Sequence, residues 1–159
     1  MIPELAILAF YSEAVSYPYI KAIHSTSKSG EKQNMLDLGP LHQKVLTHIQ
    51  VIITNPSNLL CENPSSDIAS LEGDEWQHSD IFKSIKDFDL PYLEELLIAF
   101  FTGGDETWTC FTSEFAPGSL SDAATPEELD LAWMPATNDE NEGVLGSFRK
   151  LSTSNTDSD

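Results

Sequence analysis

The sequence predicts an all-α protein, and three observations support this fold class. Apolar residues recur every three or four positions along several stretches, as in helices with one buried face. Prolines and glycines separate these stretches. No series of β-strands is recognisable. We expect about six helices in an irregular bundle with long loops, forming one domain over residues 1–151, and a disordered polar tail at 152–159.

Composition limits the functions that this chain can have. Its 159 residues correspond to about one domain. It carries 26 acidic and 8 basic side chains, a formal net charge of −18, and 40% apolar residues, which suffice for a packed core. The charge argues against binding nucleic acid or anionic lipid, because both require a basic surface. The first sixty residues carry four acidic and four basic side chains, so the net charge arises after residue 60.

The first predicted helix begins near Pro3, a residue that suits the first helical turn. Its apolar residues lie all around the helix, and only Glu4 and Glu13 are charged, so other elements must cover it on most sides. The residue before a proline avoids the α region, which predicts a break or kink near Tyr17-Pro18. One further turn is expected at 19–24, followed by a loop.

A second helix is predicted from Pro40 to Thr54, with an apolar face at helical spacing. The run Val51–Ile53 also fits a short strand, but the polar residues around it favour a helix. Residues 57–78 read as a long acidic loop, with Leu59, Leu60 and Trp76 held against the core.

Two helices are expected between Ser79 and Phe115. The first begins at Ser79 or Asp80, and the second is capped by Asp89. Gly103-Gly104 interrupts the apolar stripe of the second helix. Since each glycine costs about 1 kcal/mol in a helix interior, the pair either ends the helix or is a tolerated weak point. The aromatic spacing continues beyond the glycine pair, so we expect the helix to resume.

Two more helix starts lie near the C-terminus. Thr125 and Glu128 form a capping box, in which each side chain accepts from the backbone N–H of the other. Thr137 and Glu140 form a second capping box, which opens the last predicted helix at 137–151.

The segment Thr137 to Gly143 contains a T-N-x-x-x-E pattern that resembles the region of the last acidic ligand in DDE transposases. In such enzymes carboxylates hold two Mg²⁺ ions for phosphoryl transfer, and Glu142 would be the remnant ligand. The alternative is purely structural, because acidic residues are favoured at any helix N-terminus.

Three blocks resemble a group of uncharacterised, transposon-like proteins of mushroom-forming fungi: LDLGPLH (36–42), FTSEFAPGSL (111–120) and WMPATNDENEGVLGSFR (133–149). The resemblance implies a helical insertion, residues 1–136, ahead of the final Glu of a split catalytic domain. Strands carrying the first two Asp ligands are not identifiable. We therefore expect an inactive fragment with no confident catalytic residue, no metal and no cofactor, and Mg²⁺ only in a complete parent protein.

The alternative function is a non-enzymatic interaction module that uses an aromatic stripe. The stripe comprises Phe100, Phe101, Trp108, Phe111 and Phe115. Such a stripe is either plain core or a docking surface for a protein partner or a second copy.

The remaining candidate residues give weaker signals. His42 and His48 lie six residues apart and share no helical face, and we expect solvated or capping histidines in place of a zinc site. Cys61 and Cys110 lack metal-ligand spacing, and Cys110 is expected in or near the core. No signal peptide or membrane span is recognisable, which predicts an intracellular protein, cytoplasmic or nuclear.

Overall fold

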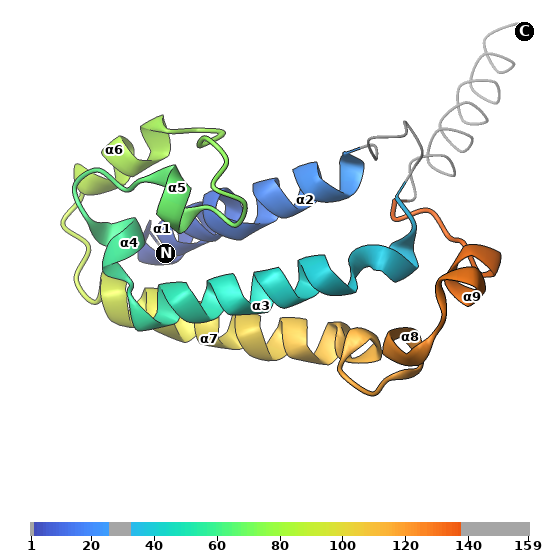
Figure 1. The fold of residues 1–159 in the computed structure, drawn as a ribbon. Coiled ribbons are helices and arrows are strands. Elements are labelled where there is room, and N and C mark those ends of the chain that lie inside the picture. The colour runs from blue at the N-terminus through green and yellow to red at the C-terminus, as the bar shows by residue number, and fades with distance from the viewer. Residues whose placement is uncertain (1, 26–32, 138–159) are drawn as a thin grey trace, which may run out of the picture.

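A computed structural model describes residues 2–25 and 33–137 and confirms the all-α class (Figure 1). The α-helices are α1 (Ile2–Tyr11), α2 (Tyr17–His24), α3 (Gly39–Thr54), α4 (Ser57–Leu60), α5 (Ser66–Ala69), α6 (Asp80–Lys86), α7 (Leu93–Phe111), α8 (Leu120–Ala123) and α9 (Pro126–Leu131). A π-helical segment, η1 (Ser12–Ser16), joins α1 to α2, and the 3₁₀ turns η2 (Met35–Leu38) and η3 (Ser113–Phe115) flank α3 and α7.

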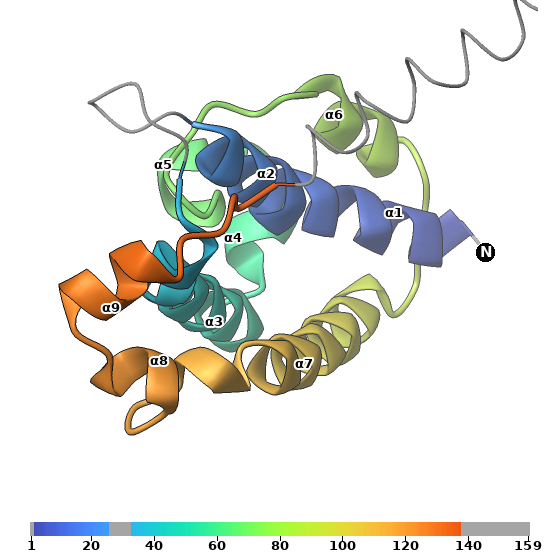
Figure 2. The same ribbon diagram turned by 90° about the vertical axis from the view of Figure 1, so that its right-hand side faces the viewer.

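The core forms where α3 and α7 lie side by side and α1 and η1 close over them (Figures 1 and 2). α3 supplies Val45, Ile49 and Ile52, all fully buried. α7 supplies Leu97 and Phe101, which are equally inaccessible. The run Val51–Ile53 belongs to α3, so this segment is a helix and the strand alternative is wrong.

The first helix bends, but it does not break before Pro18. Tyr17 keeps a right-handed helical backbone, and the chain passes from α1 through the π-helical η1 into α2. Figures 1 and 2 show α1 and α2 running in different directions. π-helical turns and prolines are the usual causes of such bends. Because Pro18 has no N–H, it cannot donate to the carbonyl of Ala14.

The prediction of a long loop at residues 57–78 is wrong, because α4 and α5 lie within it. Each is a single turn that buries one residue, Leu59 in α4 and Ala69 in α5. As predicted, Trp76 packs on the core, and its Nε1–H donates to the carbonyl of Pro64 across 3.1 Å. Single turns of this kind have no apolar periodicity, so the sequence pattern does not reveal them.

α7 passes through Gly103 and Gly104 without interruption and ends at Phe111, after which η3 carries Phe115. Its start differs from the prediction. Tyr92 holds a left-handed backbone with φ 62°, and the helix begins at Leu93, so Asp89 does not cap it.

Asn34 connects the beginning and the end of the described segment 33–137. Its Oδ1 accepts the N–H groups of Leu36 and Met134, both across 3.2 Å, and its Nδ2–H donates to the carbonyl of Leu129. Alongside it, the N–H of Met35 donates to the carbonyl of Met134 across 2.8 Å. The predicted capping box of α9 is also present: Thr125 N–H donates to Glu128 Oε2, and Glu128 N–H to Thr125 Oγ1.

Candidate interaction surface

The five residues of the predicted aromatic stripe do not share one face. Phe101 is fully buried, whereas Phe111 is 77% exposed and Phe100 is 38% exposed. Trp108 packs on the core, and its Nε1–H donates to the Tyr11 hydroxyl across 2.7 Å. Phe115 lies beyond α7, with its ring centroid 4.8 Å from that of His42. The stripe therefore contributes partly to the core and partly to the surface.

α1 has an apolar face that the described residues leave uncovered. Its inner side buries Ile7 and Phe10, but Ile2, Leu5 and Leu8 are 50%, 58% and 47% exposed. Figure 2, viewed nearly along α3 and α7, shows α1 crossing them with its N-terminal end projecting to the side. The expectation that this helix is covered on most sides is thus not met by residues 2–25 and 33–137.

Tyr11 connects this face to α7. Its ring meets Phe100 and Phe101 edge-on, with centroids 5.4 and 5.3 Å apart, and Leu8 lies one turn before it on α1. Burial raises the pKa of Tyr11. Gly104 of α7 lies close to the same ring, since a Cβ there would be in van der Waals contact with Tyr11 at 3.4 Å. We name Ile2, Leu5, Leu8, Tyr11, Leu96 and Phe100 the α1–α7 surface.

A buried carboxylate fixes the helix from which this surface projects. The Glu13 side chain in η1 is fully buried, and its Oε2 accepts the backbone N–H of His78 across 3.1 Å. The His78 ring reaches the other oxygen, with Nδ1 3.0 Å from Oε1. Nearby, the Ala14 carbonyl that Pro18 leaves free accepts the N–H of Leu71 across 2.9 Å. Both contacts tie η1 to the segment between α5 and α6, and the sequence gives no signal for either.

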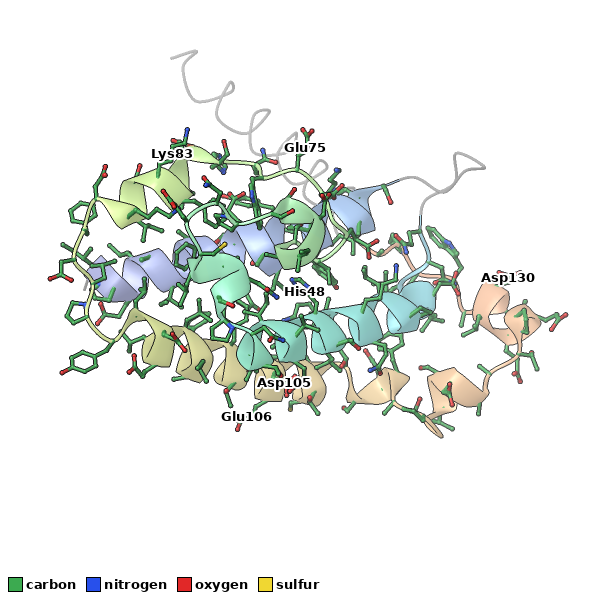
Figure 3. All side chains as sticks on the ribbon, turned by 60° about the vertical axis from the view of Figure 1, so that its left-hand side comes forward. His48, Glu75, Lys83, Asp105, Glu106 and Asp130 are labelled. Atoms are coloured by element: carbon green, nitrogen blue, oxygen red, sulfur yellow. The ribbon has the colours of Figure 1, made fainter. Side chains whose placement is uncertain are left out.

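The histidines of α3 are structural and more buried than predicted. His42 is 6% exposed, with Nε2 3.1 Å from the Tyr19 hydroxyl. His48 lies between α3 and α5, and its Nε2 is 3.2 Å from the carbonyl of Ala69 (Figure 3). Burial lowers the pKa of both histidines.

The remaining predictions concern the two cysteines, the acidic residues near the C-terminus and a metal site. Cys110 is exposed, as is Cys61, so the core position predicted for Cys110 is wrong. Glu140 and Glu142 lie outside the described residues, as do the helix expected at 137–151, its second capping box and the tail at 152–159. Among residues 2–25 and 33–137, no group of three or more His, Cys, Asp or Glu side chains has a geometry that could hold a metal ion.

The first two blocks that carry the family resemblance and the described part of the third, residues 133–137, lie at one end of the molecule. A Cβ at Gly39, in the first block, would lie 3.4 Å from Phe115 in the second. Met134, in the third, bonds to Met35 directly before the first block. Residues that are far apart in the sequence thus build one region, around the N-terminal end of α3 and α8–α9 (Figure 1).

Comparison with protein-family models, curated proteins and solved structures finds no significant match to this chain. The fold and surface define an all-α protein in which the described residues leave an apolar face of α1 exposed. None of the helices that the structure describes combines the length and the apolar character needed to span a bilayer.

Proposed function

We propose that this chain is a non-enzymatic helical module that binds a partner protein through the α1–α7 surface. The observation that carries the proposal is the apolar face of α1, with Leu5 58% exposed, which continues through Tyr11 onto Phe100. Contiguous exposed apolar residues on a folded protein mark interaction sites, because their burial releases water at about 25 cal/mol per Å².

The partner that fits this surface is an amphipathic helix with a basic polar face. Glu4 lies one turn before Leu8 on α1, and the exposed Glu94 and Glu95 precede Leu96 on α7. A second copy of the chain would bring another net charge of −18 to the interface, and like-charge repulsion opposes that association. The same negative charge attracts a lysine-rich or arginine-rich helix and favours its association.

Fluorescence anisotropy tests this proposal with a labelled amphipathic Leu/Lys helix and a scrambled peptide of identical composition. We expect the amphipathic peptide to bind at least about tenfold more tightly, because only it presents an apolar face. Leu5→Ser with Leu8→Ser should abolish the difference. Val51→Ser, which removes an exposed apolar residue from α3, is the matched control and should preserve it.

Equal binding of the two peptides would show that net charge alone drives association, and would contradict the proposal. A dimer in sedimentation experiments that Leu5→Ser dissociates would contradict it as well, because the occupant would then be a second copy. Circular dichroism melts of each variant verify that the fold is retained.

A second proposal concerns the evolutionary origin of this module. The support for common descent with the transposon-like proteins of mushroom-forming fungi is the resemblance of the three sequence blocks. In this view the chain is an inactive, acidic fragment, with Glu142 a former ligand. The flanking genomic sequence tests the idea: an in-frame upstream segment with strands ending in Asp is expected, and its absence would contradict the descent.

As part of this proposal, the protein is intracellular. Cys61 and Cys110 are both exposed and both free. Exposed thiols remain reduced in the cytosol and nucleus, which supports an intracellular location. Thiol labelling in intact cells checks this, with a mixed disulfide or complete oxidation as the contrary result.

A further inference from the structure

A cleft of about 510 Å³ lies between the N-terminal end of α3 and the segment of η3, α8 and α9. Its apolar walls are Leu36, Pro40, Phe115, Pro117 and Leu129, and its charged groups are Asp37 and Asp122. Among the described residues, no lysine, arginine or histidine lines it. The helices α8 and α9, which contribute to the cleft, lie at the opposite end of the molecule from the start of α1 (Figure 1), and the cleft shares no lining residue with the α1–α7 surface.

The apolar wall at Phe115 is held in place. The Phe115 ring packs edge-on against His42, with centroids 4.8 Å apart, and Gly39 lies directly against it. His42 is itself buried and bonded to Tyr19. An aromatic ring fixed beside a cleft offers a surface for the alkyl stem or the planar head of a long basic side chain.

The carboxylates of Asp37 and Asp122 both have oxygen atoms that can accept hydrogen bonds from a ligand. Asp122 Oδ2 accepts the N–H of Gly118 across 2.9 Å, which leaves Oδ1 unoccupied by any described residue. The Asp37 carboxylate has no hydrogen-bond partner among residues 2–25 and 33–137 either, because only its backbone N–H is bonded, to Asn34. Carboxylates beside an apolar wall favour a cation that also carries apolar surface over a fully hydrated metal ion.

We propose that this cleft binds an arginine side chain of a partner polypeptide, with the stem against Phe115 and Pro117 and the guanidinium at Asp37 and Asp122. Arginine suits the cleft because its guanidinium is planar, weakly hydrated and able to bond carboxylates with two parallel N–H groups. The net charge of −18 raises the local concentration of such a ligand.

Nuclear magnetic resonance of the uniformly ¹⁵N-labelled full chain tests the proposal. The probes are N-acetyl-L-arginine amide and its neutral isostere N-acetyl-L-citrulline amide. We expect saturable shifts of the amide signals of Asp37, Gln43 and Asp122 with the arginine probe, and at least about tenfold weaker binding of the citrulline probe. Asp37→Asn should weaken arginine binding severalfold.

Asp67→Asn is the matched control, because it removes one exposed carboxylate on α5, away from this cleft. Equal shifts with both probes, or an equal loss from Asp67→Asn, would overturn the proposal, since binding would then be nonspecific. If the amide signals of Asp37, Gln43 and Asp122 do not shift with the arginine probe, the proposal is overturned too. N-acetyl-L-lysine amide binding as tightly as the arginine probe would contradict the choice of arginine. Because the cleft and the α1–α7 surface share no residue, failure here leaves the proposed function standing.

Discussion

The backbone N–H of Leu71 donates to the carbonyl of Ala14 across 2.9 Å. An α-helix would use that carbonyl four residues later, but residue 18 is proline and has no N–H to offer. The π-helical segment η1 accommodates the proline, and the carbonyl turns to the loop after α5. The missing N–H of Pro18 thus leaves the Ala14 carbonyl available to a loop that is distant in the sequence. It also contributes to the bend that directs α1 across the bundle.

The buried Glu13 gives the first prediction. His78→Ala removes the imidazole from Oε1 and leaves a buried carboxylate with only the backbone N–H of residue 78, so we expect unfolding free energy to fall by about 1–3 kcal/mol. Urea denaturation measures it. Lys21→Ala, which breaks an exposed ion pair with Asp74, is the control, with an expected change below about 1 kcal/mol. Equal losses of unfolding free energy in His78→Ala and Lys21→Ala would show that a buried Glu13 carboxylate without its imidazole partner costs no stability.

Asn34 supports a second prediction. Asn34→Ala removes three hydrogen bonds at a site that is 5% exposed, and we expect a loss of about 2–4 kcal/mol. Hydrogen exchange should quicken at Met35 and Met134, whose N–H groups bond across this junction. Asn58→Ala serves as the control, because the Asn58 side chain has no hydrogen bond to a described residue. Unchanged exchange at Met134 would refute the role given to Asn34.

The glycine pair of α7 gives a third prediction. Apart from the backbone of its own helix, no atom of the described residues lies within 4 Å of a Cβ placed on Gly103, so Gly103→Ala should stabilise the helix by about 0.5–1 kcal/mol. Gly104→Ala should stabilise it at least as much, because its Cβ would also make van der Waals contact with Tyr11 at 3.4 Å. Thermal melts of the two variants give the comparison. A loss of stability in Gly104→Ala would contradict the packing described for Tyr11.

The pH dependence of stability follows from His42 and His48. Burial lowers the pKa of both in the folded chain, whereas in the unfolded chain it is about 6.5. Below pH 6.5 the unfolded state therefore binds protons more readily, and stability falls as the pH drops towards the lowered folded values. Melting temperatures between pH 7.5 and 5.5 should decline, and less steeply in His48→Gln than in the unsubstituted chain. An equal slope in the two proteins would exclude His48 as a contributor.

The sequence predicts those parts of the fold that local rules govern. Helical spacing places α3 and α7, and the threonine and glutamate of a capping box place the start of α9. It fails at α4 and α5, because single turns are held by tertiary contacts such as those of Leu59 and Ala69. It also misplaces Cys110, because the aromatic residues on either side of it do not both face the core: Trp108 packs on the core, but Phe111 is 77% exposed.

The candidate surface is only half predictable, for a similar reason. Phe100 belongs to the predicted stripe, but its neighbour Phe101 turns into the core. The contribution of α1 depends on the bend at η1, which brings Tyr11 against Phe100. Contacts between segments so far apart in the sequence come from packing alone.

The most direct test of the central claim is an amide chemical-shift map of the chain with the amphipathic Leu/Lys peptide. The account predicts that the largest shifts fall on residues 2–11 and 96–104, at salt concentrations that screen long-range charge. Shifts spread over acidic positions elsewhere, such as Glu75 and Asp130 (Figure 3), with none concentrated on α1, would contradict the claim.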